Sequence, residues 1–177
     1  MEMVEWEYTK AMRRDALILT CAAIIAVGIG IFMFFSGRGD LSNNSSAAAA
    51  VTVPFTKLAE GSQSEVQRRV NYIITSSSQF SELWKMANEA GTPPEIDFKT
   101  HSVVAVFAGE KPVAGYSITV EKIEDADARL VSIALAEPSD DCILAQVVTA
   151  PYEIIKVPNT SLPLAHKDIV TISGCPK

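Results

Sequence analysis

Residues 101–108 read HSVVAVFA, and this continuous apolar run is the stretch that decides the fold. Two segments follow it, YSITVEKI at 116–123 and RLVSIALA at 129–136, in which apolar and polar residues alternate. Residues 124–128 lie between them and read as a turn. Short runs rich in β-branched residues and separated by turn residues are typical of β-strands. From residue 101 onward, the pattern therefore predicts a β-sheet.

Upstream of this run, VQRRVNYIIT at 66–75 predicts a first strand, because β-branched and aromatic residues dominate its second half. A short amphipathic helix is expected next. Ser76 to Ser78 offer N-cap hydroxyls, and Gly91 with the following prolines ends the pattern. Apolar residues recur between these limits at helical spacing, namely Phe80, Leu83, Trp84 and Ala87.

Downstream, residues 144–157 predict a strand interrupted at Pro151, and residues 168–173 predict a short last strand. Five or six strands with one short helix predict an α+β domain. We expect it to be built on a mostly antiparallel sheet or an open barrel, and to extend over residues 65–177.

Residues 16–35 form a run of 20 residues without a charged side chain. A helix of this length reaches ~30 Å, which is the thickness of the hydrocarbon core of a bilayer. The run therefore predicts one transmembrane helix. A buried soluble helix would normally carry a polar face. A cleaved signal peptide would have a shorter apolar stretch that ends in small residues, whereas this run ends in IFMFF.

Basic residues flank the run mainly on its N-terminal side, as Lys10, Arg13 and Arg14. The positive-inside rule then predicts a cytoplasmic N-terminus over residues 1–15 and an extracytoplasmic C-terminal domain. The chain would be a single-pass protein of the cell membrane, held by an uncleaved signal anchor. Small residues four positions apart favour a weak homodimer through the membrane helix; they are Ala22, Ala26 and Gly30.

The stretch SGRGDLSNNSSAAAA at 36–50 has little to bury, and we expect a linker over residues 36–64. Residues 41–177 carry 11 Lys or Arg against 16 Asp or Glu, a formal charge of −5. Nucleic-acid binding needs a clustered basic surface. No nucleic-acid partner is therefore expected.

Two of the three cysteines, Cys142 and Cys175, lie in the predicted extracytoplasmic domain, and Cys21 lies in the predicted span. In an oxidising compartment an even pair is best interpreted as a disulfide. Two separate thiols remain the alternative, because the sequence does not show that the side chains meet.

The sequence offers little chemistry for catalysis. Its two histidines, His101 and His166, are not at metal-ligand spacing from each other or from a cysteine. We find no nucleophile elbow, no glycine-rich phosphate loop and no thiol-enzyme signature. The expectation is a protein that is not an enzyme and that needs neither a cofactor nor a metal.

Residues 109–117 read GEKPVAGYS and join two strong strands. Glycines permit backbone angles that other residues avoid, and Pro112 stiffens the middle of the loop. A stiff loop that ends in an aromatic residue is a good recognition surface, although a hairpin whose tyrosine packs on the core is an equal alternative. The predicted partner-binding residues are Gly109, Lys111, Pro112, Gly115, Tyr116 and Ser117.

Together with Phe80-x-x-x-Trp84, Pro94-x-Ile96-Asp97-Phe98 and the stretch from Gln146 to Tyr152, this loop resembles the PrcB C-terminal domain family. The resemblance covers about residues 70–158. It implies a non-catalytic domain that binds another protein and that stabilises or localises a protease at the cell surface.

The same loop is more weakly similar to the NPTTGY loop of chagasin-type inhibitors, but it lacks the Asn and both Thr. Our first interpretation is therefore a membrane-anchored, extracytoplasmic protein-interaction domain. A protease inhibitor acting through residues 109–117 and a structural envelope protein are the alternatives.

Overall fold

The computed structural model describes residues 4–5 and 49–175. The predicted transmembrane helix at 16–35, its small-residue face and the first part of the linker therefore lie outside the described residues. Within the described part of the chain, no helix is long and apolar enough to span a membrane.

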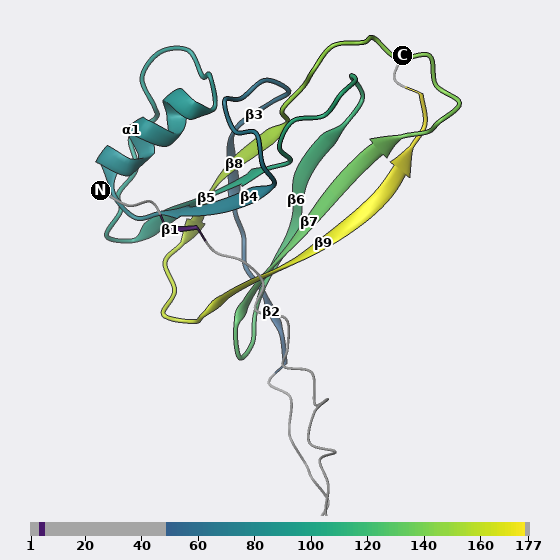
Figure 1. Cartoon of the computed structure of the whole chain (residues 1–177). Coiled ribbons are helices and arrows are strands. Elements are labelled where there is room, and N and C mark those ends of the chain that lie inside the picture. The colour runs from purple at the N-terminus through teal and green to yellow at the C-terminus, as the bar shows by residue number, and fades with distance from the viewer. Residues whose placement is uncertain (1–3, 6–48, 176–177) are drawn as a thin grey trace, which may run out of the picture. The chain divides into compact units, whose positions relative to one another are not determined.

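The strands form two sheets, shown in Figure 1. The first sheet has the order β1-β4-β5-β8-β3, and the second has the order β2-β6-β7-β9. The strands of the first sheet are β1 (Val4–Glu5), β4 (Val70–Ile74), β5 (His101–Phe107), β8 (Tyr152–Pro158) and β3 (Thr56–Gly61). Those of the second are β2 (Val51–Thr52), β6 (Ser117–Asp125), β7 (Arg129–Pro138) and β9 (Leu164–Ser173).

The apolar run at 101–108 is explained by burial of the first sheet on both faces. Val104 and Val106 of β5 belong to a core between the two sheets, with Val131 and Ile133 of β7. Val103, Ala105 and Phe107, which alternate with them, belong to a second core against the helix. A strand with two buried faces has no need for polar residues, so β5 reads as a continuous apolar segment.

The helix α1 (Ser77–Met86) forms where the sequence predicts it. The Ser76 side chain accepts a hydrogen bond from the Gln79 backbone N–H, as an N-cap does. Phe80, Leu83 and Trp84 face the first sheet. Figure 1 shows α1 on the face of this sheet that is turned away from the second sheet.

The architecture is mostly β with one short helix, and three expectations need correction. The single sheet or open barrel is wrong, because two sheets pack face to face. Within the predicted linker, residues 51–52 and 56–61 form β2 and β3. The predicted strand at 144–157 begins only at Tyr152, and residues 144–150 contain just an isolated bridge at Thr149.

A physical reason for the missed β3 lies in its register. The pairing with β8 shifts between Lys57 and Ala59, which indicates a bulge or irregularity in the strand. Leu58 and Ala59 both pack against the core on the helix side, so the alternation expected of a strand is lost. The strand β9 is longer than predicted and pairs in parallel with β7, whereas the other pairs are antiparallel.

The short strand β1 pairs antiparallel with β4, with Val4 opposite Ile73. A single membrane crossing at 16–35 would place residues 1–15 and β4 on opposite sides of the membrane. This pairing and the predicted topology therefore exclude each other in one molecule. The labelling experiment described below distinguishes the two arrangements.

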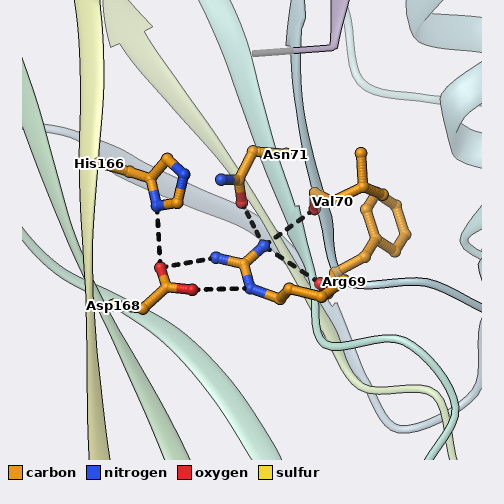
Figure 2. Close-up of polar contacts among 6 residues, drawn as sticks. Arg69, Val70, Asn71, His166 and Asp168 are labelled. Atoms are coloured by element: carbon orange, nitrogen blue, oxygen red, sulfur yellow. Dashed lines mark hydrogen bonds and ion pairs between the residues drawn. The ribbon is translucent and has the colours of Figure 1, made fainter. Parts of the chain in front are cut away.

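A polar cluster ties the edges of the two sheets together, as Figure 2 shows. The Arg69 guanidinium donates hydrogen bonds to both carboxylate oxygens of Asp168 on β9, at 3.0 and 2.8 Å. It also donates to Asn71 Oδ1 at 2.6 Å. His166 Nδ1 lies 3.0 Å from Asp168 Oδ1. The contacts are satisfied within the domain, which favours a structural role for His166.

Candidate functional site

The predicted recognition loop lies at one end of the two packed sheets. β6 begins at Ser117, directly after this loop, and ends at Asp125, where β2 pairs with it. At ~3.4 Å per residue the loop is ~27 Å from the place where the chain enters the domain. The loop and the chain entry therefore mark opposite ends of the fold.

Two glycines shape the loop as expected. Gly109 and Gly115 have φ angles of +73° and +98°, in the region that favours glycine. Gly109 is also closely packed, because a Cβ atom there would lie 2.8 Å from the Arg68 carbonyl carbon and the Arg69 nitrogen. Glycine at position 109 is thus required by both conformation and space.

The loop is bonded along its length to the segment 139–151. The Lys111 N–H donates to the Thr149 carbonyl oxygen at 2.7 Å, and the Thr149 N–H donates back at 3.0 Å. The Ala114 N–H donates to the Ala145 carbonyl oxygen at 3.1 Å, and the Thr149 hydroxyl donates to the Val113 carbonyl oxygen at 3.2 Å. We call the two segments together, 109–117 and 139–151, the two-loop surface.

The side chains of the predicted site take different positions on this surface. Pro112 and Ser117 are exposed, whereas Lys111 and Tyr116 are partly buried. Lys111 Nζ lies 5.3 Å from the centroid of the Tyr116 ring, within reach of a cation–π interaction. Tyr116 also lines a hollow of about 210 Å³ with Gly61 and Tyr152. Its ring is thus partly accessible and is not in the main core.

A disulfide joins Cys142 to Cys175, with the two Cα atoms 5.2 Å apart. It attaches the segment 139–151 to the chain just after β9. Since a disulfide restricts the chain that it closes, this bond limits the freedom of the second loop. The cysteine pair therefore belongs to the frame of the two-loop surface.

Sequence reasoning missed the apolar residues that this frame exposes. Ile143 is fully exposed, and Val147 and Val148 are roughly half exposed. The sequence pattern predicts a strand from residue 144, although Pro151 and the acidic pair before Cys142 indicate an irregular segment. Exposed acidic side chains lie in the same two loops, at Glu110, Asp140 and Asp141.

No group of three or more His, Cys, Asp or Glu side chains that could hold a metal ion occurs among residues 4–5 and 49–175. The hydrogen-bond partner of the His101 ring is the neighbouring Thr100 hydroxyl, at 2.9 Å.

Comparison with known proteins supports one family over part of the chain. A PrcB C-terminal family model matches residues 102–158, which run from β5 to the end of β8 and include both segments of the two-loop surface. The resemblance noted from the sequence is thereby confirmed for these residues. No curated protein and no solved structure matches the chain.

Proposed function

We propose that this chain, a PrcB C-terminal domain over residues 102–158, binds another protein through its two-loop surface while its N-terminal segment anchors it in a membrane. The partner is a surface protease, or a protein of its complex, that the domain stabilises or localises. One observation carries the proposal: a frame of hydrogen bonds and a disulfide holds apolar side chains in solvent. Exposed apolar residues on a rigid frame mark protein interaction sites.

The position of the surface supports this role. The chain enters the domain at the β2 end, and the two-loop surface lies at the other end of β6. The exposed acidic residues beside the apolar ones favour a partner with basic residues around its contact area.

The geometry favours docking over inhibition of an active site. Residues 111–114 are bonded to residues 145–149, so the first loop does not project from the domain alone. A composite surface of two loops matches a broad protein contact better than a narrow cleft.

The decisive test of this surface uses substitutions that leave the cores intact. We expect Val147→Asp and Tyr116→Ala to weaken partner binding by about 2 kcal/mol or more, as loss of a central contact does. The domain should melt within a few degrees of the native protein, because neither side chain is part of a core cluster. Photo-crosslinking from position 143 in cells identifies the partner, and pull-down of that partner measures the loss.

Val170→Asp provides a matched control, since Val170 on β9 is equally exposed and apolar but lies outside the two loops. It should keep full partner binding. Equal capture of the partner by the Val147→Asp and native proteins would show that recognition occurs elsewhere. If Tyr116→Ala unfolds the domain, the tyrosine is a structural residue and the loop is a well-made hairpin.

The proposed topology gives a separate prediction. In a Cys21→Ala background, Glu2→Cys should react with a membrane-impermeant maleimide only after the inner membrane is opened, because residues 1–15 are cytoplasmic. Gln63→Cys, on an exposed part of the domain, should react in cells with only the outer envelope permeabilised. Reaction of both thiols from outside would contradict a single crossing and would agree with the β1–β4 pairing.

A further inference from the structure

A cavity of about 280 Å³ lies between the sheets, at the end opposite the two-loop surface. Its position follows from residues at that end of the strands: Ser102 near the start of β5, Val157 near the end of β8 and Arg129 at the start of β7. Most of its wall is apolar, formed by Ile73, Phe98, Val104, Val157, Leu162 and Leu164. The cavity thus lies next to the core between the two sheets and shares Val104 and Val157 with it.

Two polar groups in the cavity wall are almost fully buried. Ser102 is only 4% exposed, and its hydroxyl makes no hydrogen bond to any residue that the structure describes. Arg129 is 3% exposed, and its guanidinium donates to both Asp125 oxygens at 2.7 Å and to the Pro158 carbonyl oxygen. A guanidinium has five N–H groups, so two of them lack a described acceptor. These two N–H groups and the Ser102 hydroxyl can donate to an acceptor on a ligand in the cavity.

The charge in the wall indicates the ligand class. The hydrogen bonds from Arg129 lower the pKa of Asp125, so a carboxylate charge already lies beside the guanidinium. A ligand carboxylate that approached Arg129 would be repelled by the negative charge of Asp125 beside it. A neutral carbonyl oxygen can accept from Ser102 and Arg129 without this repulsion.

We propose that this cavity binds a medium-chain acyl group, with its neutral carbonyl toward Ser102 and Arg129 and its chain against the apolar wall. An apolar cavity of ~150 Å³ holds one benzene molecule, so the volume here suits a ligand of roughly ten non-hydrogen atoms. Octanamide has this size. The site is independent of the two-loop surface and does not rest on the proposed function.

The test uses an octanamide that carries an alkyl diazirine, with the full-length protein in nanodiscs. Irradiation should label the peptides around Ser102 and Leu162, and unmodified octanamide should suppress this labelling in a saturable way. Octanoate should compete less well, because of the Asp125 charge. Labelling of peptides far from Ser102 and Leu162 serves as the internal reference and should not respond to either competitor.

Two variants separate binding from folding. Leu162→Trp, in the loop between β8 and β9, should fill the cavity and abolish the saturable labelling. Ser102→Ala should weaken the binding of octanamide about two- to tenfold, which corresponds to the loss of one neutral hydrogen bond. It should not lower the melting temperature, because it removes a hydroxyl without a described partner. Non-saturable labelling, labelling unchanged in both variants, or octanoate competing better than octanamide would each overturn the proposal.

Discussion

Replacement of Trp84 by alanine should lower the free energy of unfolding of the domain by about 3–5 kcal/mol, as truncation of a buried aromatic residue does. Trp84 is 7% exposed and belongs to the core between α1 and the first sheet. Its ring lies edge-on to Phe80, with the centroids 5.5 Å apart. A small domain has about 5–15 kcal/mol of stability in total. The variant should therefore lose a large part of its stability and unfold at a much lower urea concentration than the native protein.

A second substitution, Trp84→Phe, tests the role of the indole N–H. Trp84 Nε1 is buried and has no hydrogen-bond partner among the described residues. Trp84→Phe loses volume but also removes this unsatisfied donor, so it should cost less than about 1.5 kcal/mol. Glu82→Ala, on the exposed face of α1, should stay within about 0.5 kcal/mol of the native protein. Urea titration of the full-length protein in mild detergent, followed by near-ultraviolet circular dichroism, measures all three.

A Trp84→Ala protein with native stability would mean that α1 is not docked on the first sheet. A Trp84→Phe protein as unstable as Trp84→Ala would mean that the indole nitrogen has a partner. These outcomes distinguish a packing role for the side chain from a polar role.

The elements with strong local patterns could be predicted from the sequence. The N-cap serines and the spacing of Phe80, Leu83 and Trp84 fix α1, and the apolar or alternating runs locate β5, β6 and β7. Their partition into two sheets could not be predicted, because it depends on contacts between distant segments. β3 pairs with β8 nearly a hundred residues later, and its own sequence, TKLAEG, resembles a loop.

The candidate site was predicted in part for the same reason. The glycines of the first loop have local consequences, and their positive φ angles follow from the sequence pattern. The second loop has no such signal. Its exposed Ile143 and Val147 depend on the disulfide and on hydrogen bonds to the first loop, which only the folded chain brings together. Glu153 was also missed, although it is the one acidic residue within the apolar stretch at 150–155.

Glu153 lies on β8, is completely buried and contacts both sheets. One carboxylate oxygen accepts a hydrogen bond from the Val120 N–H on β6, where the register of β6 shifts. The other oxygen lies 2.8 Å from Lys57 Nζ on β3. A bulge frees a backbone N–H from the ladder, and the buried carboxylate satisfies it. Glu153 thus connects the two sheets near the two-loop end.

Glu153→Ala should destabilise the domain by about 3–5 kcal/mol, because it leaves a cavity and an unpaired N–H and removes one of the two carboxylates that contact Lys57. Glu153→Gln keeps an acceptor for the Val120 N–H and should cost clearly less. Lys57→Ala should cost about 1–3 kcal/mol, since water can reach the site of this half-exposed side chain. Equal stability of the Glu153→Ala and native proteins would show that the carboxylate does not hold the sheets together.

The pH dependence of stability tests the ion pair itself. Hydrogen bonding to Glu153, and then to Glu60, raises the pKa of Lys57 from 10.5 to about 12. A raised lysine pKa contributes stability that is complete below the unfolded value and is lost as pH rises through the folded value. The native protein should therefore lose more stability between about pH 9 and pH 12 than Lys57→Ala does.

The double variant Lys57→Ala/Glu153→Ala completes a thermodynamic cycle. Because the two side chains are in contact, the effects of the two single substitutions on the free energy of unfolding should be non-additive by more than about 0.5 kcal/mol. Additive effects and identical alkaline profiles would mean that Lys57 neutralises Glu60 alone and that the buried carboxylate is stabilised only by the backbone of β6.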